Sequence, residues 1–83
     1  MKIAIAGAGA FGTGLSISLA SNGQVTLWAR DSDAALAMAA SRENTVRLPN
    51  HKIPGNVLIT SDLEHIFVAD TIMLAIPAQK LGD

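Results

Sequence analysis

Three glycines near the N-terminus have the spacing G-x-G-x-x-G, at Gly7, Gly9 and Gly12, directly after an apolar segment. Gly7 allows the chain to turn sharply, Gly9 has no side chain to hold the backbone away from a pyrophosphate, and Gly12 lets the next helix lie close to the preceding strand. The N–H groups in the first turn of that helix then face the phosphates, and the helix dipole favours their negative charge. The pattern therefore predicts the phosphate-binding turn of a dinucleotide site.

The end of the second apolar segment, Leu27-Trp28-Ala29-Arg30, indicates which dinucleotide fits. An NAD site usually carries Asp or Glu here, because a carboxylate accepts hydrogen bonds from the adenosine ribose. A guanidinium instead pairs with a 2′-phosphate, so Arg30 favours NADP(H). Asp31 leaves NAD(H) open, since a one-residue shift would place its carboxylate in the pocket. Trp28 lies on the same side of the strand as Arg30 by alternation, and either walls the adenine pocket or fills the core.

The segments that must position these residues alternate between strand and helix patterns. We expect strands over residues 2–6, 24–29, 57–60 and 71–76, helices over 11–21, 33–42 and about 61–69, and a loop over 44–56. This alternation predicts an α/β fold, a Rossmann-like parallel sheet of strand order 3-2-1-4 with helices on both faces. The ligand crevice is expected at the carboxyl ends of the first and fourth strands.

Local signals support the helix boundaries. Gly23 is expected to end the first helix, and the segment Asp31-Ser32-Asp33 to cap the second. Ser61-Asp62 is expected to cap the third helix, with Glu64 completing a capping box three residues after Ser61.

The composition excludes several classes of function. The 83 residues suffice for one small domain, and a net charge of −1 lacks the basic face that nucleic acids need. The sequence has no Cys, so it forms no disulfide or thiolate metal site, and the cytoplasm is its expected location. His51 and His65 stand alone, without a second ligand at metal spacing, so no metal site is predicted.

Two other interpretations of the N-terminal segment, a secretory signal peptide and a membrane helix, are disfavoured. Gly7, Gly9, Gly12 and Gly14 would each cost about 1 kcal/mol in a helix interior relative to Ala. The polar residues at positions 16, 18, 21 and 22 also interrupt the apolar run before it reaches the length of a membrane span. We therefore expect no membrane span.

Taken together, these segments resemble the N-terminal part of bacterial NAD(P)-dependent glycerol-3-phosphate dehydrogenase. The similarity covers essentially all 83 residues and rests on four motifs: Gly-Ala-Gly-Ala-Phe-Gly-Thr at 7–13, L-W-A-R-D at 27–31, R-E-N-x-x-x-L-P at 42–49 and Leu-Ala-Ile-Pro at 74–77. The glycine motif is generic to dinucleotide domains, whereas the second and third motifs together are much more specific.

The resemblance implies hydride transfer between a nicotinamide cofactor and the pair glycerol 3-phosphate and dihydroxyacetone phosphate, which serves phospholipid synthesis. It implies cofactor contacts at Ala10, Phe11 and Arg30, with backbone contacts near Pro77. Arg47 stands where the family often has an aromatic residue, and offers a second cation that reaches phosphate. The candidate cofactor-binding residues are therefore Gly7, Gly9, Ala10, Phe11, Gly12, Arg30, Arg47 and Pro77.

No catalytic residue is assigned in this chain. The family's catalytic lysines lie beyond residue 83, and Lys52 and Lys80 match neither of them. We expect residues 1–83 to be the N-terminal portion of a dinucleotide-binding domain, with the substrate domain absent. The small phosphorylated substrate would bind through that missing domain, and a homodimer is left open.

Two alternatives stay open from the sequence. One is a regulatory nucleotide-binding module, and the other is a related 3-hydroxyacyl or ketoacid dehydrogenase. A downstream helical domain with a positioned Lys would distinguish a dehydrogenase from the regulatory module, because the fold alone does not decide function.

Overall fold

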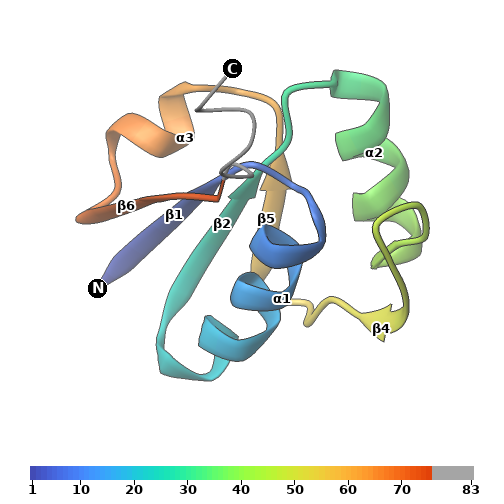
Figure 1. Cartoon of the computed structure of the whole chain (residues 1–83). Coiled ribbons are helices and arrows are strands. Elements are labelled where there is room, and N and C mark those ends of the chain that lie inside the picture. Colours follow the sequence, from blue (N-terminus) through green and yellow to red (C-terminus); the bar gives the residue numbers. More distant parts are fainter. Residues whose placement is uncertain (76–83) are drawn as a thin grey trace, which may run out of the picture.

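The computed structural model describes residues 1–75, in which parallel strands alternate with helices (Figure 1). The expected strands and the first two helices lie within two residues of their predicted bounds, and the predicted end of the last strand, residue 76, lies outside the described residues. In chain order the elements are β1 (Lys2–Ala6), α1 (Ala10–Leu19), the 3₁₀ turn η1 (Ala20–Asn22), β2 (Gln24–Trp28), α2 (Ser32–Ser41), β3 (Glu43–Asn44), β4 (Leu48–Lys52), β5 (Val57–Thr60), α3 (Glu64–Phe67) and β6 (Thr71–Leu74).

The main sheet has four parallel strands in the order β5-β2-β1-β6, which confirms the predicted order 3-2-1-4. The central strand β1 pairs with β2 from Lys2–Gln24 to Ala6–Trp28, and with β6 from Ile3–Thr71 to Ala6–Leu74. Right-handed crossovers place α1 and α2 on one face of this sheet and α3 on the other. The helices therefore cover both faces, as predicted, and all four strands direct their carboxyl ends to one edge (Figure 1).

The two faces of the sheet differ in how completely they are covered. The face under α1 and α2 carries the buried core, because the alternate residues of the strands pack there against Ala20, Ala35 and Met38. Its largest members on the strands are Ile5, Val25, Leu27, Val57 and Ile59. On the other face Ala4 and Ile66 are buried, but several large apolar side chains are exposed: Leu58, Leu63, Phe67, Val68, Ile72 and Leu74.

The predicted loop over residues 44–56 is wrong in part, because the chain forms an antiparallel hairpin from β3 and β4. Glu43 pairs with Lys52 and Asn44 with Leu48, with an irregularity between them. Pro49 favoured a loop in the sequence, but a two-stranded hairpin tolerates a residue without an N–H group at its edge. Asn50 adopts a left-handed φ of 69°, which ordinary strand patterns do not include.

Aspartate side chains accept hydrogen bonds from main-chain N–H groups at the N-termini of α2 and α3. The carboxylate of Asp31 accepts a hydrogen bond from the Asp33 N–H at 3.0 Å, which confirms the predicted cap of α2. The predicted capping box of α3 is wrong, because Asp62, rather than Ser61, accepts from the N–H of Glu64, at 3.0 Å. This helix ends at Phe67 rather than near residue 69.

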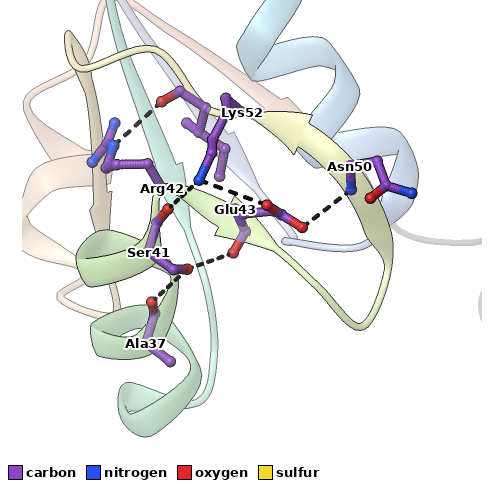
Figure 2. A network of polar contacts seen from close by, with 7 residues as sticks. Ala37, Ser41, Arg42, Glu43, Asn50 and Lys52 are labelled. Carbon is purple, nitrogen blue, oxygen red and sulfur yellow. Dashed lines mark hydrogen bonds and ion pairs between the residues drawn. The ribbon is translucent and has the colours of Figure 1, made fainter.

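A polar network fixes the base of the hairpin to the C-terminus of α2 (Figure 2). Arg42 ends α2 in the left-handed region, with φ of 56°, and its N–H donates to the Met38 carbonyl at 2.7 Å. Its guanidinium donates to three main-chain carbonyls that precede or begin β5, those of Ile53, Pro54 and Val57. The base of the hairpin is thus tied to both α2 and the main sheet.

The remaining bonds of this network join the two hairpin strands to each other and to Ser41. The Glu43 carboxylate lies 3.7 Å from the Lys52 ammonium and accepts from the Asn50 N–H at 3.1 Å. Lys52 also donates to the Ser41 carbonyl at 3.2 Å, and the Ser41 hydroxyl lies 3.1 Å from the Glu43 carbonyl. These bonds hold the base of the hairpin without any contribution from its tip.

Helix α1 packs directly on the turn that precedes it, and two glycines allow this. Gly7 has a φ of 122°, and a Cβ on it would lie 2.7 Å from the Ala75 carbonyl oxygen. A Cβ on Gly12 would overlap the Gly7 carbonyl oxygen and approach the Ala75 Cβ to 3.1 Å. Gly14 differs, since a Cβ there would meet only Leu48 Cδ2, at 4.0 Å.

We predict opposite effects for the same substitution at two positions of α1. Gly12→Ala should lower the free energy of unfolding by about 2 kcal/mol or more, because backbone must move to admit the methyl group. Gly14→Ala should raise it by about 0.5–1 kcal/mol, because Ala restricts the unfolded chain and the site has room. Thermal denaturation followed by circular dichroism measures both, and equal effects of the two substitutions would contradict the packing described above.

Candidate functional site

A cleft of about 1120 Å³ opens at the carboxyl edge of the sheet, where the sequence predicted the ligand crevice. The glycine turn and the start of α1 form one wall, and the β3–β4 hairpin forms another, with the end of β2 and one side of α2 between them. The lining residues are 7–11, 29–31, 43–47, Ala34, Ala37, Met38, Ser41 and Ala75.

The first turn of α1 offers main-chain donors to this cleft. Gly9 is the N-cap residue, in an extended conformation, and it provides no side-chain cap. The first helical bond runs from the Thr13 N–H to the Gly9 carbonyl, at 2.9 Å, so the N–H groups of residues 10–12 have no acceptor within the helix. This turn contains no acidic residue. The positive end of the helix dipole therefore stands uncompensated beside the cleft.

The backbone at Gly9 has open space in front of it. A Cβ on Gly9 would meet no heavy atom within 4 Å, although Gly9 lines the cleft. The absence of a side chain at this position is therefore not required by packing within the protein. It leaves room for another molecule to approach the backbone, in contrast to Gly7 and Gly12, where neighbouring backbone excludes a side chain.

Two guanidinium groups and two carboxylates line the cleft. The carboxylate of Asp31 caps α2, and that of Glu43 is bound by Lys52 and Asn50, so both acidic groups have partners in the protein. Arg30 and Arg47 are exposed, and among residues 1–75 neither side chain forms an ion pair or a hydrogen bond. The cleft therefore favours an anionic ligand.

Apolar and small side chains complete the lining. Phe11 at the start of α1 and Val46 at the tip of the hairpin are 69% and 83% exposed. Ala34, Ala37 and Ser41 lie along one side of α2, and because their side chains are small, this wall of the cleft has no large projections. The cleft thus combines charge and main-chain donors with apolar surface, a mixture typical of sites for nucleotides and other cofactors.

Asn44 joins the two walls of the cleft through hydrogen bonds of its side chain. Its side-chain amide nitrogen donates to the Ala8 carbonyl at 2.8 Å and to the Thr13 hydroxyl at 2.9 Å. Its amide oxygen accepts from the Arg47 N–H at 3.3 Å. Asn44 is 5% exposed. Asn44 is not among the site residues predicted from the sequence, because its partners at Ala8 and Thr13 lie more than thirty positions away along the chain.

The structure brings together six of the eight predicted site residues. Gly7, Gly9, Ala10, Phe11, Arg30 and Arg47 all line the cleft. Gly12 lies below the turn and does not line the cleft, since it packs against Gly7 and Ala75. Pro77 lies outside the described residues.

Trp28 does not line the cleft, so the expectation that it walls the adenine pocket is not supported. It is half-buried, and within residues 1–75 its buried indole N–H has no acceptor. Alternation along β2 directs Trp28 to the face opposite to Leu27, away from α1 and α2.

Residues 1–75 contain neither a metal-binding cluster nor a membrane-spanning helix. No group of three or more His, Asp or Glu side chains in residues 1–75 lies close enough to hold a metal ion. None of the helices in this part of the chain has the length and apolar character needed to cross a membrane.

Comparison with known proteins gives consistent results. The sequence of Roseobacter denitrificans glycerol-3-phosphate dehydrogenase (NAD(P)+) is 52% identical over 81 residues, and that of the Ruegeria enzyme is 47% identical over 81 residues. Each alignment covers 98% of this chain and 25% of the relative, so the chain spans about a quarter of the length of these curated relatives.

Among solved structures, glycerol-3-phosphate dehydrogenase from Coxiella burnetii is similar, with a TM-score of 0.83 and 36% sequence identity. The superposition covers 92% of this chain and 24% of that one. The family model described as the NAD-dependent glycerol-3-phosphate dehydrogenase N-terminus matches residues 2–83. The resemblance seen in the sequence motifs is thereby confirmed, and the chain belongs to the NAD-dependent glycerol-3-phosphate dehydrogenase family, to whose N-terminal part it corresponds.

Proposed function

We propose that this chain is the nucleotide-binding part of an enzyme that interconverts glycerol 3-phosphate and dihydroxyacetone phosphate. The observation that carries the proposal is the uncapped N-terminus of α1, which faces a cleft lined by Arg30 and Arg47. The names of the relatives support the reaction and the cofactor class. When bound, a nicotinamide dinucleotide supplies the hydride for reduction of the substrate carbonyl.

The residues of the cleft fit a dinucleotide. The N–H groups of residues 10–12 suit a pyrophosphate, and the open space at Gly9 admits it close to the backbone. Phe11 and Val46 offer apolar surface to the flat rings of the ligand. These contacts bind and orient the cofactor, while α2 and the hairpin shield it from water on one side.

The positions of Arg30 and Asp31 favour NADP(H) over NAD(H). The Asp31 carboxylate accepts from the Asp33 N–H and so serves as the cap of α2, which accounts for its presence after β2. Arg30 has no partner of its own among residues 1–75, and it lines the cleft next to that cap. A 2′-phosphate would pair with this guanidinium, and Arg47 is a second cation in the same cleft.

The chemistry of substrate reduction requires residues outside this chain. Lys52 is held by Glu43 and the Ser41 carbonyl, and it does not line the cleft. Lys80 lies outside the described residues. The exposed apolar side chains around α3 and β6 support a larger protein in which further chain covers that face. A cytoplasmic location, a role in phospholipid synthesis and a homodimer remain predictions.

Gly9→Val should weaken NADPH binding about tenfold or more, a loss of about 1.4 kcal/mol, because its side chain fills the space proposed for the pyrophosphate. Gly55→Val is the matched control, since Gly55 also has open space and an ordinary φ but lies outside the cleft. Fluorescence titration of the full-length protein measures both dissociation constants. Unchanged affinity in a folded Gly9→Val variant would refute the pyrophosphate assignment.

Arg30→Ala should weaken NADPH binding by about 1.5–3 kcal/mol, because it removes a charge-assisted pair with the 2′-phosphate. NADH lacks that phosphate, so its affinity should change much less. The same titration with the two cofactors gives the comparison. If both lose affinity equally, Arg30 contributes to adenine binding or to the fold rather than to cofactor choice.

The full-length protein should oxidise NADPH when given dihydroxyacetone phosphate, while residues 1–83 alone should show no turnover. The two carboxylates that line the cleft, those of Asp31 and Glu43, are bound within the protein, and Lys52 does not line it. Absorbance of NADPH follows the reaction. Turnover by residues 1–83 would show that this part of the protein contains a catalytic group. Turnover of the full-length protein only with a hydroxyacyl or ketoacid substrate would assign it to the related dehydrogenases.

A further inference from the structure

We infer that Asn44 is a positioning residue for the cofactor: it holds the glycine turn and the Arg47 loop in the arrangement that binds the dinucleotide. The inference rests on the proposed function, since it concerns how the same cleft is kept ready for its ligand. Asn44 is far from the glycine motif in the sequence, but in the folded chain its side chain binds the turn that this motif forms.

The orientation of the Asn44 amide follows from its partners. The Ala8 carbonyl can only accept and the Arg47 N–H can only donate, so the amide nitrogen must face Ala8 and the amide oxygen must face Arg47. Both protons of the amide nitrogen are used, one toward Ala8 and one toward the Thr13 hydroxyl, which is fully buried. An Ala, Asp or Leu side chain could not make this set of bonds.

The bond to Ala8 acts on the part of the turn that precedes the phosphate donors. The peptide between Ala8 and Gly9 is planar, so holding the Ala8 carbonyl sets the direction of the Gly9 N–H and limits rotation at Gly9. Glycine is the most permissive residue at such a position, and no side-chain cap restrains it. The bond from Asn44 to Thr13 ties the same amide to the first helical turn, so the turn and helix cannot shift independently.

The third bond places the second candidate cation. The Arg47 N–H donates to the Asn44 oxygen, which fixes the backbone from which the Arg47 side chain extends into the cleft. Asn44 thus joins the pyrophosphate side of the cleft to its hairpin side. Preorganisation of this kind raises affinity, because ligand binding need not order the loop.

The hairpin has a second set of contacts besides those of Asn44. Its base is held by the bonds of Arg42, Glu43 and Lys52 (Figure 2), none of which involves Asn44. Loss of the Asn44 side chain should therefore release the tip of the hairpin and the glycine turn while the base stays in place. This separation allows the effect on binding to be measured in a folded protein.

The test uses the full-length protein and calorimetric titration with NADP⁺ and NAD⁺. Asn44→Ala should weaken binding of both by about tenfold or more, because the pyrophosphate is common to them and up to three hydrogen bonds are lost. Thr13→Val keeps the shape of the side chain and removes one acceptor, so it should weaken both by about threefold. Asn56→Ala is the matched control, since Asn56 donates from the same amide nitrogen to the Ala20 carbonyl, away from the cleft.

Asn44→Asp adds a pH profile that removal of the side chain in Asn44→Ala would not produce, and circular dichroism at each pH checks that the variant stays folded. At about pH 8 the carboxylate would face the Ala8 carbonyl without a proton to donate, and binding should be as weak as in Asn44→Ala. Burial favours the neutral acid, so at about pH 6 the protonated carboxyl should donate to Ala8 and restore part of the affinity. The ratio of its dissociation constant to that of the unaltered protein should therefore fall as the pH falls, while the ratio for Asn44→Ala stays constant.

The outcomes separate this inference from the proposed function. Binding of both dinucleotides that is unchanged in folded Asn44→Ala and Thr13→Val variants would overturn the role of Asn44 and leave the proposed function intact. Loss of affinity in Asn56→Ala equal to that in Asn44→Ala would also overturn it, by showing a general effect of stability. Failure of the unaltered protein to bind either dinucleotide would overturn the proposed function itself and this inference with it.

Discussion

The close packing of α1 on the turn before it is the constraint on which the rest of the structure depends. Gly12 approaches the Gly7 carbonyl so closely that a methyl group does not fit, and Ala75 closes the space from the other side. This contact fixes the direction in which the helix begins, and so aims its first N–H groups at the carboxyl edge of the sheet. The donors of the cleft are thus main-chain groups, and the close packing at Gly7 and Gly12 sets the direction in which they point.

The second wall of the cleft is built on polar bonds rather than on apolar burial. The hairpin lies outside the main sheet, and its base is held by main-chain carbonyls around the Arg42 guanidinium. Its tip is held by Asn44, whose buried amide would be costly to the fold without partners. The amide nitrogen of Asn44 has two acceptors and its amide oxygen has one donor. One arrangement of the hairpin and the glycine turn is therefore strongly favoured over others.

The charge of the cleft depends on how its acidic residues are used. Asp31 and Glu43 also line the cleft, but the carboxylate of Asp31 caps α2 and that of Glu43 pairs with Lys52 and joins the hairpin strands. Arg30 and Arg47 have no side-chain partner among residues 1–75, so both guanidinium groups are available to a ligand in the cleft. The same residues that stabilise local structure thus contribute to the electrostatic character of the cleft.

The sequence by itself determined the alternation of strands and helices, the strand order and the edge of the sheet at which the cleft lies, because apolar periodicity and glycine spacing are local and the handedness of crossovers leaves few arrangements. The motifs at 27–31 and 42–49 indicated the family. Arg30 and Phe11, which the sequence singled out, both line this cleft. Only the tertiary structure decided that residues 43–52 form a hairpin and that Asn44 binds a turn 36 positions earlier. Antiparallel pairing around Pro49 and a hydrogen bond between distant segments depend on distances in space, for which the local sequence carries no signal.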